Sequence, residues 1–277
     1  MTRRAVALGL LRSCHPEPSV AVTGFAVALS VAVGRSPAGV VLAGCAVGAG
    51  QLSVGWHNDW LDAERDEVSA RPDKPVAQGT VPRRLVRRAA GVAVAAVIPL
   101  SLACGWRAGL AHLAAVALAW GYNWRWKATV WSWVPYAGAF ALLAAFVTLG
   151  LPVPRWPPWW ALVAAALLGV GAHLANAAPD LAEDLAGGIR GLPHALGYRR
   201  SVVAATGLLL VASLLIAFGA GHPGVTSAVG LAVVVAAVAA GLVWGRCEGS
   251  RLLFRLSMVI AAADVAMLVA RGHALVG

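Results

Sequence analysis

The chain has 277 residues, of which 60% are hydrophobic and only 12% are charged, and its mean hydropathy is +0.75. A soluble domain of average composition carries about 25% charged residues, so this composition excludes an ordinary soluble globular protein. The formal net charge of +10 does not indicate a nucleic-acid-binding protein. The basic residues are spread over loops beside apolar segments, where membrane topology and anionic lipid head groups account for most of them.

Eight long apolar segments without charged residues follow one another along the chain, and a ninth, at 252–270, is interrupted by Asp264. A membrane-spanning helix needs roughly 17–25 apolar residues. The sequence therefore predicts an all-α polytopic membrane protein with nine transmembrane helices, at residues 18–34, 36–58, 89–106, 108–124, 128–154, 156–179, 201–218, 225–245 and 252–270. Residues 1–17 are expected to form an interfacial N-terminal segment. No stretch remains for a soluble domain, so residues 1–277 are expected to form a single transmembrane domain.

The basic residues predict the orientation of these helices. If the N-terminus is cytoplasmic, 18 of the 22 Lys and Arg residues lie on the cytoplasmic side, and only Arg35, Arg107, Arg155 and Arg271 lie outside. Positive charge is enriched in cytoplasmic loops. We therefore expect a multi-pass protein of the plasma membrane with a cytoplasmic N-terminus.

Most of the acidic residues belong to two segments that share one spacing, Asn-x-x-x-Asp-x-x-x-Asp. Nine of the 12 Asp and Glu residues lie in or beside these segments. The two motifs are Asn58, Asp62 and Asp66, with Asp59 beside them, and Asn176, Asp180 and Asp184. If both segments are helical, steps of four place each trio on one helix face. Both motifs fall at the cytoplasmic ends of predicted helices.

Two such faces across a cleft would gather five carboxylates in a small volume. Like charges at this density repel strongly unless cations lie between them. Oxygen-only ligands, without His or Cys at metal spacing, favour Mg²⁺, which is usually bound together with substrate phosphate. The predicted metal ligands are Asp59, Asp62, Asp66, Asp180 and Asp184. A solvated loop remains the better interpretation for Glu64 and Glu67.

Basic residues on the same side favour an anionic ligand. Arg71, Lys74, Lys127 and Arg190 lie in cytoplasmic loops that could close over the two motifs. A diphosphate could be held jointly by Mg²⁺ and these side chains. Taken singly, each cation is explained about equally well by membrane topology. Arg71 and Lys74 are favoured because two prolines stiffen the segment that carries them.

The segments resemble the motifs of the UbiA superfamily of intramembrane prenyltransferases. The first resemblance lies in residues 58–66 and the sequence Arg-Pro-Asp-Lys-Pro at 71–75. The second lies in residues 180–184 and the Gly and Leu-Pro residues after them. Tyr122, Arg125 and Lys127 are similar to a Tyr-…-Arg/Lys-x-Lys element of the family. The resemblance covers nearly the whole chain.

The resemblance implies nine helices around a central cavity and transfer of a prenyl group from an isoprenyl diphosphate to a lipophilic acceptor. The five aspartates would carry Mg²⁺, and Asn58 and Asn176 would orient ligands or diphosphate. Arg71, Lys74 and Lys127 would neutralise the leaving group. Tyr122 is the aromatic residue that we expect in the cavity, where ring faces can stabilise an allylic cation. The acceptor is not identified by the sequence.

Two other functions compete with prenyl transfer. A membrane terpene cyclase would ionise the same diphosphate and let the cation react with its own double bonds. The segment 131–136, Trp-Ser-Trp-Val-Pro-Tyr, motivates this alternative, because many family members have a Gly-Asn pair there. Transport is disfavoured, since the acids lie at one face and transporter sites usually lie at the bilayer midplane. His57, His173 and Asp264 are left without an assigned role.

Overall fold

The computed structural model describes residues 2–68, 74–245 and 250–276, and all regular secondary structure in these residues is helical. The helices are α1 (Arg3–Arg12), α2 (Pro16–Ala32), α3 (Pro37–Val68), α4 (Arg83–Ala103), α5 (Trp106–Trp124), α6 (Trp133–Leu149), α7 (Trp159–Ala177), α8 (Leu181–Ala186), α9 (Leu192–Leu196), α10 (Tyr198–Gly219), α11 (Val225–Trp244) and α12 (Leu252–Val269). Single 3₁₀ turns cover Trp126–Ala128, Ala178–Asp180 and Gly272–Leu275.

The predicted all-helical fold agrees with the structure, but the count of nine spans is not confirmed. Six segments in the described chain are long and apolar enough to cross a membrane by length and composition: Pro37–Val68, Arg83–Ala103, Trp159–Ala186, Tyr198–Gly219, Val225–Trp244 and Leu252–Val269. Each of the other three predicted spans overlaps one helix. Helices α2 and α6 are apolar but have only 17 residues each, and α5 is not among the apolar spans although it has 19.

Turn residues set several of the helix boundaries. Pro16 and Pro37 begin α2 and α3, where the missing N–H of proline costs nothing. Between α4 and α5 the chain reverses within two residues, and Gly105 has a φ of 105°, which a residue with a side chain rarely adopts. The long helices can therefore lie side by side as antiparallel neighbours.

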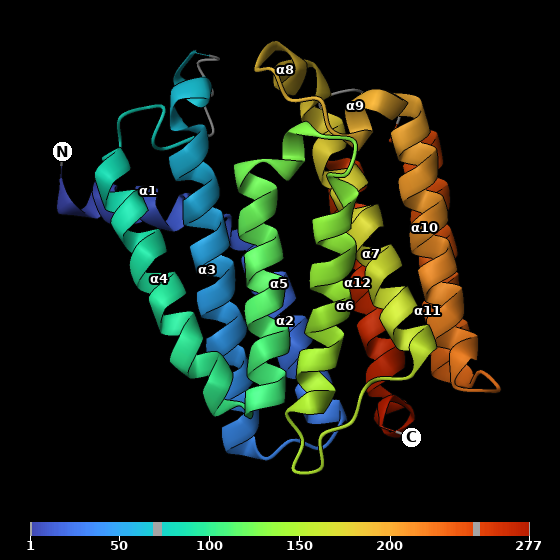
Figure 1. The fold of residues 1–277 in the computed structure, drawn as a ribbon. Coiled ribbons are helices and arrows are strands. Elements are labelled where there is room, and N and C mark those ends of the chain that lie inside the picture. The colour runs from blue at the N-terminus through green and yellow to red at the C-terminus, as the bar shows by residue number, and fades with distance from the viewer. Residues whose placement is uncertain (1, 69–73, 246–249, 277) are drawn as a thin grey trace.

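Six helices form a closed ring. Contacts run from α2 to α3, from α3 to α5, then through α6, α7 and α12 back to α2. Helices α4, α10 and α11 pack on the outside of this ring, against α3, α7 and α12 (Figure 1). A buried apolar cluster joins the ring helices away from the acidic motifs, with Val47, Phe146 and Trp160 among its members. The ring encloses the cavity described below.

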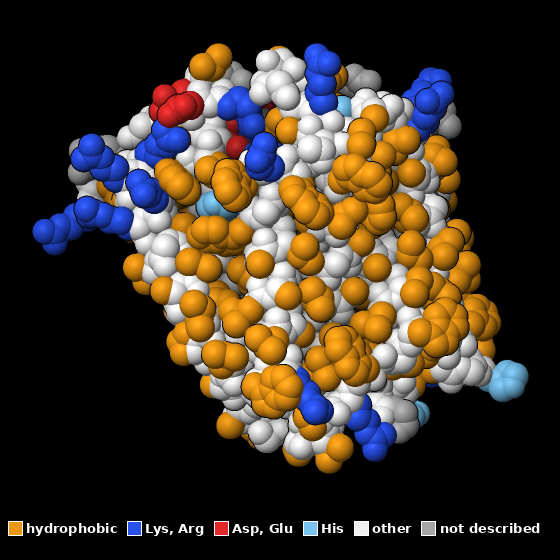
Figure 2. Space-filling model, viewed as in Figure 1, with side chains coloured by type: hydrophobic (Ala, Val, Ile, Leu, Met, Phe, Trp, Pro, Cys, Tyr) orange, Lys and Arg blue, Asp and Glu red, His pale blue; other side chains and the backbone are white. Residues whose placement is uncertain are grey.

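The functional motifs lie at one end of the bundle. Figure 1 shows that α8, α9 and the loop between α5 and α6 lie at the same end as the last turns of α3. Helix α1 lies across the long helices near this end. Apolar side chains cover the middle of the face shown in Figure 2, whereas Lys and Arg gather toward its two ends and Asp and Glu at the upper end only. This distribution fits a membrane-embedded bundle.

Candidate functional site

The first acidic motif lies on a single uninterrupted helix. Helix α3 continues to Val68, so Asn58, Asp62 and Asp66 follow one another at full turns along it. The side chains of Asp59, Asp62 and Asp66 are buried, which is unusual for carboxylates unless they are paired. The expected alignment on one helix face is therefore present.

Asp59 is held by two cationic or potentially cationic groups from different segments. Lys74 Nζ donates to Asp59 Oδ1 at 2.7 Å, and His15 Nε2 lies 2.9 Å from the same oxygen. His15 connects α1 to α2 and has a φ of 53°, a left-handed conformation that is uncommon for a residue with a side chain. Gly55 allows this approach, because a Cβ at that position would overlap the Cys14 carbonyl group.

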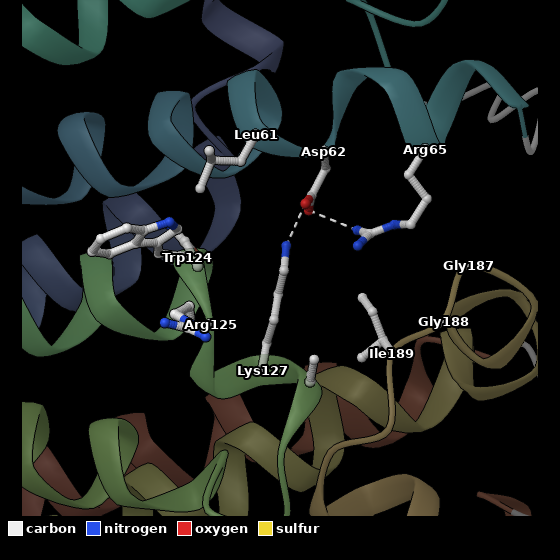
Figure 3. A pocket seen from close by; sticks show the side chains of 11 residues that line it. Leu61, Asp62, Arg65, Trp124, Arg125, Lys127, Gly187, Gly188 and Ile189 are labelled. Carbon is white, nitrogen blue, oxygen red and sulfur yellow. Dashed lines mark hydrogen bonds and ion pairs between the residues drawn. The ribbon is translucent and has the colours of Figure 1, made fainter.

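Asp62 is the centre of a second set of contacts. Lys127 Nζ donates to Asp62 Oδ1, while Arg65 Nη2 lies 2.9 Å from Oδ2 (Figure 3). Asn58 also donates to Oδ2, at 3.1 Å, and Asn123 links Asn58 to the backbone of α3. Burial lowers the pKa of Lys127, and the nearby carboxylates, Asp62 foremost, oppose that shift. These carboxylates therefore stabilise the charged form of Lys127.

The second motif departs from the prediction of one continuous helix. Helix α7 ends at Ala177, a 3₁₀ turn follows, and α8 begins at Leu181. Pro179 explains the interruption, since proline lacks a backbone N–H and its ring clashes with the preceding turn of an α-helix. Asn176 thus lies on α7, Asp180 ends the 3₁₀ turn, and Asp184 lies within α8. The expectation of one shared helix face is wrong for this trio.

The loop after α8 returns to the site and brings a histidine that the sequence analysis did not identify. His194 Nε2 lies 3.7 Å from Asp184 Oδ2, and the His194 side chain is 4% exposed. Its Nδ1 accepts a hydrogen bond from the Gly191 N–H at 3.1 Å. Burial lowers the pKa of His194. No sequence spacing signals this contact, because the loop between residues 187 and 191 sets it.

An adjoining hydrogen-bond chain fixes the same loop to α7. Leu192 N–H donates to Ser132 Oγ at 3.0 Å, and Ser132 Oγ lies 3.0 Å from His173 Nε2. The ring of His173 stacks on Tyr136 with centroids 4.7 Å apart, and Tyr122 meets both rings edge-on at 4.9 and 5.5 Å. Three rings from α5, α6 and α7 therefore form one aromatic cluster beside the acidic motifs.

These groups line one cavity of about 610 Å³ inside the helix ring. Its polar end contains the acids and amides of both motifs together with Lys74, Lys127 and Arg65. Its opposite end is lined mainly by apolar side chains, with His112 among them: Phe25, Val47, Val116, Phe140 and Leu143. A smaller outer pocket of about 430 Å³ adjoins the polar end, and Figure 3 shows Arg65 and Lys127 pointing toward Asp62 there.

The structure brings most of the predicted residues together. Those that line the cavity are Asn58, Asp59, Asp62, Asp66, Lys74, Tyr122, Lys127, Asn176, Asp180 and Asp184. Arg190 is exposed and is not among the lining residues, because the chain turns toward α9 with Ile189 directed inward. Arg71 lies outside the described residues. His57 stacks on Trp120 at 3.8 Å, and Asp264 is buried in α12 away from the cavity lining.

The donor set fits Mg²⁺ as a shared ligand of protein and substrate. The acidic end offers carboxylate and amide oxygens, which hard divalent cations prefer. Within the described residues, no three His, Cys, Asp or Glu side chains converge on one point as a closed metal cage. Lys74, Lys127 and Arg65 instead compensate the carboxylates. Such an open set suits an ion that takes further ligands from substrate phosphate.

A cavity with a charged mouth and an apolar interior, enclosed by membrane-type helices, can hold a molecule with a polar head and an apolar tail. The sequence model of the UbiA prenyltransferase family matches residues 19–258. The chain therefore belongs to the UbiA prenyltransferase family.

Individual relatives agree with this assignment. The digeranylgeranylglyceryl phosphate synthase of Pyrococcus abyssi (strain GE5 / Orsay) is 30% identical over 169 residues, which cover 59% of this chain and 57% of that protein. The match thus spans little more than half of that relative. A UbiA homolog from Archaeoglobus fulgidus, in a structure bound to GPP and Mg²⁺, has a TM-score of 0.72 at 19% identity, covering 97% and 99% of the two chains.

A second solved structure shows the same fold. The apo structure of a UbiA homolog from Aeropyrum pernix K1 has a TM-score of 0.72 at 18% identity and covers 92% of this chain and 98% of that one. At 18–19% identity these similarities show a shared arrangement of the helices. The GPP and Mg²⁺ were bound by the Archaeoglobus fulgidus protein.

Proposed function

We propose that the protein is a Mg²⁺-dependent intramembrane prenyltransferase, which moves an isoprenyl group from an isoprenyl diphosphate to a lipophilic acceptor. One observation carries the proposal: both acidic motifs line the polar end of a single cavity whose other end is apolar. A diphosphate head matches the polar end, and an isoprenyl tail matches the apolar end. Membership of the UbiA prenyltransferase family supports the same reaction class.

The polar end is suited to stabilise a diphosphate as it leaves. Bound Mg²⁺, held by Asp59, Asp62, Asp66, Asp180 and Asp184, would supply Lewis-acid stabilisation of the charge that develops on the leaving oxygen. Lys74 and Lys127 bind carboxylates of the first motif through ammonium groups that can also donate to phosphate oxygens. Arg71 is proposed to add a further cation. Asn58 and Asn176 present amide groups to orient the ligands.

The adjoining rings are suited to the cation that remains on the donor carbon. Tyr122, Tyr136 and His173 form a cluster on the cavity wall. Ring faces attract positive charge, and their apolar surface keeps water from the reacting carbon. The acceptor would attack within this cluster and lose a proton as the new bond forms.

The membrane arrangement proposed here follows the charge distribution. Helices α2–α7 and α10–α12 would form nine spans of one transmembrane domain, 1–277, in the plasma membrane. Helix α1 would lie at the interface, and the acidic end of the cavity would face the cytoplasm. With 17 residues each, α2 and α6 lie at the short end of the length range for membrane spans.

A terpene cyclase is the second candidate, and the aromatic cluster is the observation that favours it. Three mutually contacting rings beside the diphosphate end could stabilise a cation that migrates along its own chain. Such an enzyme would ionise the same donor at the same acids and would need no acceptor.

A product analysis tests both functions. Purified protein is incubated with Mg²⁺ and geranyl, farnesyl or geranylgeranyl diphosphate, with and without lipophilic acceptors, and products are identified by mass spectrometry. A product that requires an acceptor supports prenyl transfer, whereas a cyclic hydrocarbon or alcohol formed without one supports the cyclase. Diphosphate release that persists in chelator, or in Asp62→Ala and Asp180→Ala, contradicts both.

A further inference from the structure

The buried histidine of α9 faces the second acidic motif without a hydrogen-bond partner on that side. His194 Nε2 is buried and makes no hydrogen bond within the described structure. The nearest acidic oxygen is Asp184 Oδ2, at 3.7 Å. That distance is too long for a hydrogen bond and short enough to become one through a small movement, as polar contacts in ligand-free sites often do.

The other ring nitrogen defines which hydrogen His194 can offer. Gly191 N–H donates to His194 Nδ1, so Nδ1 acts as an acceptor and carries no hydrogen. In a neutral imidazole the hydrogen then lies on Nε2, the atom that faces Asp184. His194 is therefore a donor toward the carboxylate, and this tautomer cannot remove a proton from a substrate through Nε2.

The segment that carries His194 is fixed on both sides. A Cβ at Gly191 would lie 2.6 Å from the Lys127 carbonyl oxygen, so the start of α9 packs directly against the loop that bears Lys127. Leu192 N–H is bonded to Ser132. After the end of α8, the Ile189 N–H donates a hydrogen bond to the Asp184 backbone carbonyl at 2.8 Å. These contacts keep the histidine beside the carboxylate.

We propose that His194 is a positioning residue, whose Nε2–H donates to Asp184 and orients that carboxylate toward the Mg²⁺–diphosphate head group. This inference rests on the proposed function, and it adds a residue of the cavity wall that acts through Asp184. Hydrogen bonds to a metal-binding carboxylate set its direction, and loss of such partners typically weakens metal binding or activity about 10- to 100-fold. The hydrogen bond from Gly191 to Nδ1 then has a function, because it keeps the hydrogen on the nitrogen that faces Asp184.

The test measures ligand-dependent stability instead of turnover. Melting temperature of the full chain in detergent is followed as Mg²⁺ is titrated at a fixed concentration of inorganic pyrophosphate, which gives a Mg²⁺ midpoint. His194→Phe keeps a ring but removes the donor, and His194→Gln returns an amide N–H close to the position of Nε2. The exposed His222 lies in the loop between α10 and α11, and His222→Phe is the matched control.

We expect His194→Phe to raise the Mg²⁺ midpoint about 10-fold or more, His194→Gln to restore most of it, and His222→Phe to leave it unchanged. In Asp184→Asn, the further change His194→Phe should have little additional effect, since the two residues act together. His194→Asn replaces the Phe variant if that protein does not fold.

Two results would overturn the proposal. Unchanged midpoints in the Phe variant show that His194 does not act on the site, and equal losses in the Phe and Gln variants show that Nε2–H donation is not its role. A wild-type protein whose melting temperature does not respond to Mg²⁺ and pyrophosphate contradicts the proposed function itself, and the inference falls with it. The two kinds of failure are therefore distinguishable.

Discussion

Lys127 donates a hydrogen bond to Asp62, although the two residues lie 65 positions apart in the chain. Lys127 follows α5, and Asp62 lies near the end of α3. Both side chains are largely buried at the polar end of the cavity. The pair therefore joins the first acidic motif to the basic loop that faces the second motif.

Loss of the Lys127 ammonium should slow the reaction strongly. Lys127→Met removes a donor from the place where negative charge develops, and removal of one such group typically costs about 100- to 1,000-fold in rate. Steady-state diphosphate release by the purified variant checks this expectation. Arg107→Gln is the control, because Arg107 is exposed beside Trp106 at the other end of α5 and should leave the rate unchanged. A Lys127→Met rate equal to that of wild type would remove Lys127 from the site.

The same pair predicts a stability effect that is independent of catalysis. Asp62→Asn leaves buried cationic groups without their carboxylate, which should lower the free energy of unfolding by about 3 kcal/mol. The additional change Lys127→Met should recover part of that loss. The control is Glu64→Gln, since the Glu64 side chain is 80% exposed and its surface pair with Arg83 contributes only about 0.5 kcal/mol. The stabilities of the wild type, Asp62→Asn, the double variant and Glu64→Gln are compared by thermal unfolding in detergent. A double variant less stable than Asp62→Asn would contradict the pairing.

The apolar end of the cavity predicts which donor lengths are accepted. Val47 and Asp62 both line the cavity and are 15 residues apart on α3, so the cavity, polar end included, extends about 22 Å along this helix at a rise of about 1.5 Å per residue. Val47→Phe should fill its blind end and shift kcat/KM toward geranyl diphosphate. Leu143→Ala should shift it toward longer donors. The comparison uses donors of increasing length at fixed Mg²⁺, and an unchanged ranking in both variants would place the tail elsewhere.

A glycine on α3 should be essential for the contact between His15 and Asp59. Gly55→Ala introduces a methyl group that overlaps the Cys14 backbone, which cannot move aside cheaply, and overpacking of this kind costs about 1–3 kcal/mol. We expect lower melting temperature and a raised KM for the donor. Gly48→Ala on the same helix is the matched control, because its nearest neighbour atom would be 3.7 Å away, an ordinary contact. Equal behaviour of the two variants would contradict the expected role of Gly55.

The sequence predicts the positions of the long helices and the geometry of the first acidic motif, but not the geometry of the second motif. Charge-free segments predicted where the long helices lie, and steps of four predicted that Asn58, Asp62 and Asp66 share a face. The second motif reaches the cavity by another route, because Pro179 divides it between two helices. Periodicity predicts residues within one helix, and it carries no information on a break of this kind.

Contacts made through loops were the part that the sequence could not supply. His15 meets Asp59 from the linker between α1 and α2, and His194 lies near Asp184 on the short helix α9. Arg190 was expected at the diphosphate but is exposed, since the local chain direction turns its neighbour Ile189 inward instead. The blind end of the cavity also cannot be located from the sequence, because apolar residues that line the cavity and apolar residues that face lipid have the same composition.

The interruption at Pro179 gives the two sets of aspartates different mechanical surroundings. Asp62 belongs to a rod of 32 residues and moves with any tilt of α3. Asp184 belongs to a six-residue helix tethered at both ends by turns. We therefore expect a change in bilayer thickness that tilts the long helices to displace the first carboxylate set more than the second.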